Sequence, residues 1–313
     1  MRACEEASTT RISTTDVPPA ERIEYWENYN ATALVGLRCS AFAARGLHAD
    51  QANTDLGGMR IAEITGNEHV IERTPAHVRR LPSDSVFLSI IVRGNAFFYH
   101  GGGHIPVGSG EALLYDPAKP YLFGFGGAMQ KVLLDLPSAP FRERCLPSAL
   151  TEPVKLGTTT TERALVQRLR AELLGESGAI SAAELAERVW ALGGALLGAP
   201  TANAHILLAN AYIDAHLTDD RLTPAHVARA TGISTRHLNR LLAAEGNTAD
   251  GDTIAARITT RRLEAARSRL RAGDPRTIGD IAADCGFTSQ PHFTRLFNRR
   301  FGMSPGEARA DCP

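Results

Sequence analysis

The 313-residue sequence contains no apolar run that approaches the 18 residues typical of a membrane-spanning helix. Its first residues, MRACEEASTTRISTTD, are too polar for a secretory signal peptide. The five cysteines are odd in number and too scattered for a zinc finger or a disulfide framework. We therefore expect a cytoplasmic protein that makes no contact with a membrane.

The sequence also lacks the residue patterns of common enzyme classes. Ser, His and Asp residues are plentiful, but none lies in a nucleophile elbow, and no phosphate-binding loop occurs. His100, His104 and Glu111 are possible metal ligands, yet the two histidines flank three glycines in a predicted hairpin turn, and no close His-x-His pair is present. We predict no metal, no cofactor and no enzymatic activity. A cupin-type β-barrel metalloenzyme with a helical appendage is the alternative.

Lysine is missing from residues 204–313, which carry 15 arginines against 12 acidic residues, a net charge of +3. The whole chain is neutral, so residues 1–203 carry −3. The bias is strongest in residues 257–309, where 11 arginines face 5 acidic residues. A basic segment made only of arginine favours a local anionic partner such as nucleic acid. A solvated helix face is the other interpretation.

The length and an apolar fraction of 43% indicate a globular protein of about two domains. Residues 1–20 read as a flexible arm, and residues 21–34 have helical apolar spacing. From about 37 to 136, short apolar runs alternate with glycine and proline, which is typical of an antiparallel sandwich or barrel. The clearest strands are predicted at 86–94, 95–100, 111–116, 121–125 and 131–136.

Two helices are predicted next, at 161–175 and 181–198. Leu165, Leu169 and Leu173 form an apolar stripe on the first of them. Such a stripe is either core or a dimer seam, and we expect a homodimer formed through residues 161–175.

A domain boundary is expected near residues 201–205, because everything after it reads as helix and tight turn. This places a sensory and dimerisation domain at 21–200 and a DNA-binding domain at 205–313.

The C-terminal region contains an internal repeat. VARATGISTRHLNRLL (227–242) and IAADCGFTSQPHFTRLF (281–297) share an apolar residue, an alanine, a turn glycine and a hydroxyl residue before a second helix. Ser234 and Thr288 are the predicted caps. This order is that of a helix-turn-helix unit. A long helix at 253–270 joins the copies and is expected to bury Ile254, Ile258 and Leu263.

The segment GFTSQPHFTRLFNRRFGMSPGEAR (286–309) resembles the signature of the AraC family of bacterial transcription regulators. That signature runs Gly-Phe, Ser/Thr, Phe-x-Arg-x-Phe, Phe-Gly-x-Ser-Pro and Arg. RRLEAAR (261–267) and the first repeat match other landmarks, so the resemblance covers about residues 205–310. One departure is the run at 243–254, about five residues longer than the family's usual turn.

The N-terminal half is similar to the family's sensory domains more loosely, through ERTP (72–75), the glycines at 101–103 and YDPAKPY (115–121). The resemblance implies an α+β two-domain fold. Its N-terminal part is a cupin-like β-barrel with flanking helices, and its C-terminal part is all-α with two helix-turn-helix units. It also implies a ligand-responsive, sequence-specific DNA-binding activator with double-stranded DNA, a small-molecule effector and RNA polymerase as partners.

In each second helix of the repeat, the polar positions near the N-terminus face away from the apolar stripe. Arginine there can pair with guanine, and glutamine or asparagine with adenine. These positions also match the family's base-contacting residues. The predicted base contacts are Arg236, Asn239, Arg240, Gln290, His292 and Arg295. The predicted contacts to the DNA backbone are Thr235, Ser289, Arg299 and Arg300.

An effector pocket needs an apolar lining with a few polar groups. We expect it in the N-terminal barrel, although each candidate is also a plausible core residue. The predicted lining residues are Phe97, Tyr99, Tyr115, Tyr121, Phe123 and Phe125, with Arg73 or Arg93 as the anchor.

Overall fold

The computed structural model describes residues 8–146, 150–176, 178, 180–245 and 253–310. The chain divides into two compact units, Met1–Ala204 and His205–Pro313. No helix in the described ranges is long and apolar enough to cross a membrane.

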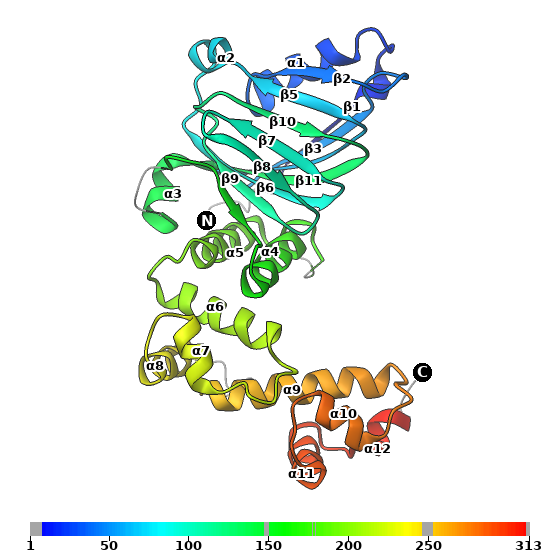
Figure 1. Ribbon diagram of the computed structural model, residues 1–313, viewed down its shortest axis with the longest axis vertical. Helices are drawn as coiled ribbons and strands as arrows, with labels where there is room; N and C mark the ends of the chain where they lie inside the picture. Colours follow the sequence, from blue (N-terminus) through cyan, green and yellow to red (C-terminus); the bar gives the residue numbers. More distant parts are fainter. Residues whose placement is uncertain (1–7, 147–149, 177, 179, 246–252, 311–313) are drawn as a thin grey trace, which may run out of the picture. The chain divides into compact units, whose positions relative to one another are not determined.

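The first unit is built around two antiparallel sheets (Figure 1). One has seven strands in the order β1-β3-β4-β11-β6-β9-β12, and the other has five in the order β2-β5-β10-β7-β8. The strands are β1 (Thr9–Ser13), β2 (Arg38–Ala41), β3 (Ala49–Asp55), β4 (Arg60–Gly66), β5 (His69–Arg73), β6 (Ser85–Arg93), β7 (Ala96–His100), β8 (Gly103–Val107), β9 (Ala112–Tyr115), β10 (Tyr121–Phe125), β11 (Met129–Pro137) and β12 (Val154–Leu156).

The five predicted strands correspond to β6, β7, β9, β10 and β11, and their boundaries agree within a few residues. The closed barrel is wrong: within the described residues, β1 and β12 end one sheet and β2 and β8 end the other. Part of the expected flexible arm, residues 1–7, lies outside the described residues. Strand β1 lies within the rest of that arm and pairs along its whole length with β3, so this part is held in the sheet.

The core between the two sheets is aromatic. Phe98, Tyr121 and Phe123 of the five-stranded sheet face Phe87 and Tyr115 of the seven-stranded sheet, and all five are buried. Rings this close contribute edge-to-face and offset-stacked contacts in addition to the area they bury. Phe98 lies 4.8 Å from Tyr115 and 5.2 Å from Tyr121, measured between ring centroids.

Helices cover the outer face of the seven-stranded sheet. Leu88, Leu114 and Leu134 of that face line one packed region with Leu169 and Trp190 from the helices. The elements of this unit outside the sheets are η1 (Thr14–Asp16), α1 (Arg22–Ala33), α2 (Pro75–Arg80), α3 (Ser138–Arg144), α4 (Thr160–Leu173) and α5 (Ala182–Leu196).

The leucine stripe at 161–175, which is either core or a dimer seam by sequence, is core. Leu165, Leu169 and Leu173 on α4 are 1%, 0% and 6% exposed within a single chain. The stripe packs against the chain's own sheet and α5, because a sheet face of leucines needs an apolar helix to cover it. It is therefore not available to a second copy.

The second unit is all helical (Figure 1). Its helices are α6 (Ala202–Ala215), α7 (Pro224–Ala230), α8 (Thr235–Glu245), α9 (Ile254–Arg271), α10 (Ile278–Asp284), α11 (Gln290–Phe301) and α12 (Pro305–Ala310). Helix α9 contributes to two separate apolar clusters. Ile254 and Ile258 belong to the cluster with α6, α7 and α8, and Leu263 belongs to the cluster with α10, α11 and α12. All three are buried, as predicted.

Candidate nucleic-acid interface and interior cavity

The turns α7–α8 and α10–α11 share one backbone geometry. In the first, Gly232 has φ +71° and the N–H of Ile233 donates to the carbonyl of Ala228. In the second, Gly286 has φ +80° and the N–H of Phe287 donates to the carbonyl of Ala282. Both are helix ends of the Schellman type, which need a residue in the left-handed region, and glycine adopts it without strain. The two copies therefore fold alike.

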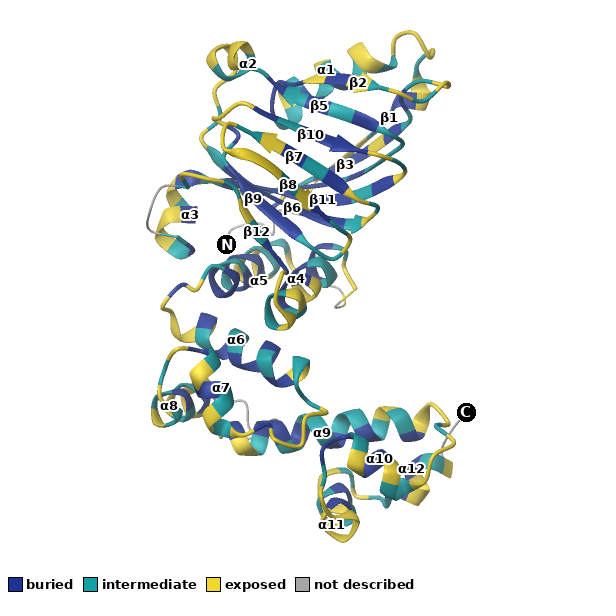
Figure 2. Cartoon of the chain, in the orientation of Figure 1, coloured by how far each residue is buried: buried dark blue, intermediate teal, exposed yellow. Residues whose placement is uncertain are grey.

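The buried sides of the second helices also correspond. Leu238 and Leu242 of α8 are 0% and 1% exposed, and Phe293 and Phe297 of α11 are both 0% exposed. The spacing of four residues places each pair on one side of its helix. The opposite side of α11 is exposed along its length (Figure 2).

One of the two predicted caps is wrong. The hydroxyl of Ser234 accepts a hydrogen bond from the N–H of His237, as predicted. At α11 the N-cap position is Ser289 instead of Thr288, and its side chain makes no capping hydrogen bond. Pro291 near the start of α11 has no N–H, so one donor that a cap would satisfy is missing there.

The exposed side of α11 is slightly hollowed and carries most of the predicted contacts. Its lining is Gln290, Pro291, Thr294, Arg295 and Asn298. His292, Arg299 and Arg300 are exposed outside this hollow. The guanidinium of Arg300 lies 3.4 Å from a carboxylate oxygen of Glu264 on α9. Thr294 is expected on the outward side of this helix from its spacing of four from Gln290. Asn298 is not predicted, although it lies four residues after Thr294 on the same face.

Helix α8 presents a smaller set of the predicted residues. Arg236 and Arg240 are exposed, and Thr235 is half-buried. The amide oxygen of Asn239 accepts a hydrogen bond of 3.0 Å from the N–H of Ile254, the first residue of α9. That N–H has no partner within its own helix, so this contact of Asn239 stabilises the start of α9.

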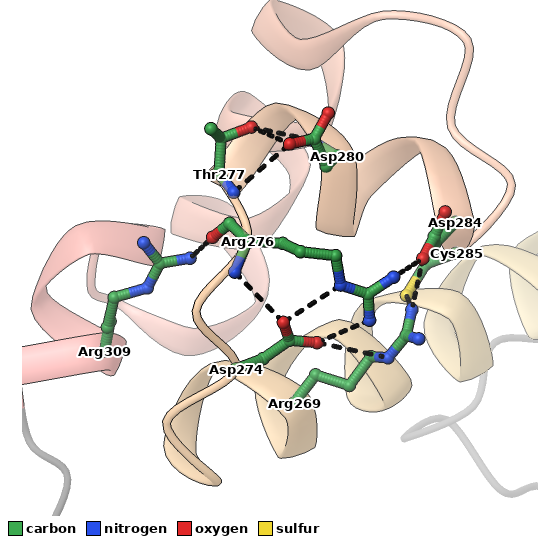
Figure 3. Close-up of polar contacts among 8 residues, drawn as sticks. All are labelled: Arg269, Asp274, Arg276, Thr277, Asp280, Asp284, Cys285 and Arg309. Atoms are coloured by element: carbon green, nitrogen blue, oxygen red, sulfur yellow. Dashed lines mark hydrogen bonds and ion pairs between the residues drawn. The ribbon is translucent and has the colours of Figure 1, made fainter.

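A polar network fixes the loop between α9 and α10 (Figure 3). Asp274 accepts from the guanidinium of Arg276 at 2.6 Å, and Arg276 also pairs with Asp284 on α10. Arg269 on α9 lies 3.3 Å from the same Asp284 carboxylate. The bonds from Arg276 lower the pKa of Asp274 to about 2. Arg309 on α12 donates to the carbonyl of Arg276, so three helices meet at this loop.

The sequence predicts only one part of this network. The segment Thr277-Ile-Gly-Asp280 has the spacing of a capping box, and both of its hydrogen bonds form. The ion pairs among Arg269, Asp274 and Arg276 depend on the fold of the loop, which no local pattern specifies. Their effect is to hold α10, and through it α11, against α9.

The suggested metal ligands serve other contacts. His100 lies 3.2 Å from Glu152, and Glu111 accepts from Lys155 and from the N–H of Gly108. The ring of His104 packs against Tyr99. In the ranges that the structure describes, no cluster of three or more His, Cys, Asp or Glu side chains is arranged to hold a metal ion.

The predicted effector residues divide into three groups. Arg73 is buried, but three of its nitrogens donate to the carbonyls of Pro117, Gly36 and Leu81, so its guanidinium stabilises the fold. Strand alternation separates the other candidates. Phe97 and Tyr99 lie outside the space between the sheets, and Tyr115, Tyr121, Phe123 and Phe125 lie inside it. Arg93 has the parity of the inward-facing Ile91, but it is the last residue of β6 and is exposed, so it also lies outside that space.

A cavity of about 220 Å³ opens at one end of the space between the sheets. Phe98, Tyr115 and Tyr121 form its aromatic part, and Asp116, Lys119 and Glu152 contribute charged groups. A cavity of about 150 Å³ is large enough for a benzene ring. This one therefore has room for a molecule with one ring.

Two family models match the chain: an AraC-binding-like domain over residues 26–207 and a helix-turn-helix domain over residues 227–311. The first alone spans more than half of the chain. The chain belongs to the AraC family. As an AraC-family protein it is a ligand-responsive, DNA-binding transcription regulator, and the metalloenzyme alternative is not favoured.

Relatives of this AraC-family chain carry regulator names. The transcriptional activator NphR of Rhodococcus sp is 27% identical over an alignment of 301 residues that covers 90% of this chain and 88% of NphR. Regulatory protein SoxS of Escherichia coli (strain K12) is 37% identical over 99 residues, 32% of this chain and 87% of SoxS. The crystal structure of the AraC-like transcriptional activator CuxR aligns with a TM-score of 0.49 at 22% identity, over 89% of this chain and 100% of that chain.

Proposed function

We propose that α8 and α11 are the DNA-reading helices of this regulator and that each enters the major groove by its N-terminal part. The observation that carries the proposal is the duplicated turn. In each copy it presents a helix with one buried apolar side and one exposed side that contains arginine. A helical hairpin that serves only packing has no need of this arrangement twice in a basic segment.

Within this proposal the residues divide by their position along each helix. Arginine, glutamine and histidine side chains in the first half of each helix contact base edges, and the hydroxyl residues at the helix starts and the arginines further along contact phosphate. The base contacts are assigned to Arg236, Arg240, Gln290, His292 and Arg295, and the backbone contacts to Thr235, Ser289, Arg299 and Arg300. Asn239 retains only its amide nitrogen for a base, because its oxygen binds Ile254.

The first unit is the sensor in this proposal, and its effector occupies the space between the two sheets. The cavity of about 220 Å³ and its aromatic lining support this placement. We extend the proposal to activation of transcription through contact with RNA polymerase in the cytoplasm, since NphR, which covers 90% of this chain, is an activator. A homodimer also remains part of the proposal, but its interface excludes the leucine stripe of α4.

A salt titration tests the DNA-binding mode. The affinity of the full chain for a labelled duplex from upstream of its own gene is measured by fluorescence anisotropy at several salt concentrations. Each phosphate contact contributes a slope of about −0.9 to log affinity against log salt. We expect a steep negative slope. A slope near zero would contradict the proposal, because it would mean that the exposed arginines of α8 and α11 do not meet phosphates.

A further inference from the structure

Lys131 is a buried cation in the interior of the first unit. It lies on β11 between Met129 and Leu133, and the alternation of the strand directs all three side chains into the space between the sheets. Lys131 is 2% exposed. A lysine this deeply buried is rare unless it has a partner of opposite charge.

In the described part of the chain, the ammonium group of Lys131 contacts no hydrogen-bond acceptor and no carboxylate. Its contacts are with aromatic faces, at 4.9 Å from the ring centroid of Phe123 and 5.4 Å from that of Phe125. Burial lowers the pKa of Lys131 to about 7. Burial also lowers the pKa of the neighbouring His69 to about 4, so this imidazole is neutral at pH 7.

Lys131 lines a small space that adjoins the larger cavity. The space of about 20 Å³ is bounded by Lys131, His69, Trp26, Tyr115 and Tyr121, among others. Tyr115 and Tyr121 also line the cavity of about 220 Å³. Two tyrosine rings therefore separate a space the size of one small polar group from a space the size of one ring.

The chemistry of these walls restricts the ligand. A single ammonium group matches one negative charge, and the buried Arg73 of the same unit already donates to three carbonyls. This excludes a phosphate dianion, which needs several donors. The stacked and edge-on rings of Phe98, Tyr115 and Tyr121 favour an aromatic body.

We propose that the sensor binds a small carboxylic acid with one aromatic ring, its carboxylate on Nζ of Lys131 and its ring among Phe98, Tyr115 and Tyr121. The two tyrosine rings rotate to join the two spaces when the ligand enters. This inference rests on the proposed sensor role of the first unit and gives that site its ligand class.

The test compares acids with their uncharged amides. Benzoate, phenylacetate and 4-hydroxybenzoate, with the three corresponding amides, are titrated into the full chain by calorimetry. A charge-assisted hydrogen bond favours the acid by about tenfold or more. We expect at least one acid to bind with this preference over its amide. If no acid binds, or if acids and amides bind equally well, the inference is overturned.

Two variants test whether Lys131 is the residue that gives the preference for the acid over its amide. Lys131→Met keeps the length of the side chain without charge, and it should remove the preference for the acid; Lys131→Gln is used if Lys131→Met does not fold by circular dichroism. Lys155→Met is the matched control, because Lys155 is a lysine of the same unit that pairs with Glu111 away from the interior. It should keep the preference. An acid preference that survives in Lys131→Met would overturn the inference.

A measurement of DNA binding shows whether a negative result contradicts the proposed ligand class or the proposed function on which it rests. The unmodified chain and the control Lys155→Met are therefore also titrated with the upstream duplex in the absence of any probe, and both should bind it. If that duplex is bound but no acid preference exists, only the ligand class fails. If the unmodified chain binds no duplex with salt dependence, the proposed function fails whatever the probes do.

Discussion

The guanidinium of Arg262 lies against Gly286, so close that a Cβ atom at position 286 would be 2.5 Å from Cζ of Arg262. Arg262 also donates to the carbonyls of Leu217 and Asp219, at 3.2 and 2.7 Å. One side chain of α9 thus joins the loop after α6 to the turn before α11. Position 286 therefore requires glycine for two reasons: its φ is +80°, and a side chain there would clash with Arg262.

Gly286→Ala should therefore destabilise the chain by about 2–3 kcal/mol, because the methyl group adds a steric clash to the cost of a positive φ. Gly232→Ala is the matched control. Its φ is +71°, but a Cβ atom there would meet nothing within 4 Å, so it should cost only about 1 kcal/mol. Thermal unfolding followed by circular dichroism measures both. Equal losses of stability would show that the Arg262 side chain moves aside freely.

Asn239 distinguishes a capping role from a reading role. Asn239→Ala should lower stability by about 0.5–2 kcal/mol, because the N–H of Ile254 loses its partner. DNA affinity should fall to the same extent for all sequences. The check is a thermal melt together with binding to a set of duplexes that differ at single base pairs. An altered base preference with unchanged stability would instead make Asn239 a base-reading residue.

Lys131 makes stability depend on pH. Its pKa is 10.5 in the unfolded chain and about 7 in the folded one, so the unfolded state binds more protons between these values. The free energy of unfolding should therefore rise with pH across this range. The destabilisation that comes from burying the charged ammonium group should be fully present below pH 7. Lys131→Met lacks this cost and should be more stable at pH 7 by roughly 2–4 kcal/mol.

The measurement is denaturant unfolding of both chains from pH 6 to pH 10, since the advantage of Lys131→Met should shrink as pH rises. His69 is present in both chains, and burial, the largest cause of its lowered pKa, is common to them. A constant difference across this range would mean that Lys131 keeps an ordinary pKa in the fold.

The two similar helix, glycine-turn and helix segments could be predicted from the sequence because their determinants are local. The turn glycines Gly232 and Gly286, the preceding small and apolar residues and the later apolar pairs lie within about 16 residues of one another. The predicted N-cap of α11 is wrong by one residue. Thr288 and Ser289 are both hydroxyl residues, and only the backbone conformation of the folded chain shows that Ser289 is the N-cap.

The sensor could be predicted only in outline. The alternation of apolar and polar residues predicts individual strands. The pairing of β1 with β3 and the open edges of the two sheets depend on contacts between residues far apart in the chain. Arg73 is predicted to bind the effector, but its guanidinium donates to the carbonyls of Pro117, Gly36 and Leu81 instead. No local sequence pattern identifies these three partners. The sequence pattern assigns no function to Lys131, although the two-residue repeat of a strand places its side chain on the same face as that of Leu133.

The most direct test of the account contrasts two arginines of α11. Arg295 lines the hollowed face near the start of the helix, and Arg299 is exposed one turn later. Arg295→Ala should cost about 1–3 kcal/mol of binding and relax the preference at one or two base pairs. Arg299→Ala should weaken binding to all sequences and reduce the salt slope by about one unit.

Both variants should keep their helical circular dichroism, because neither side chain is buried. The deciding measurement is the affinity of each variant for duplexes substituted at every position of the bound site. The account predicts that only Arg295→Ala changes the order of these affinities. A changed order for Arg299→Ala with an unchanged order for Arg295→Ala would contradict the proposed entry of α11 into the groove by its N-terminal end.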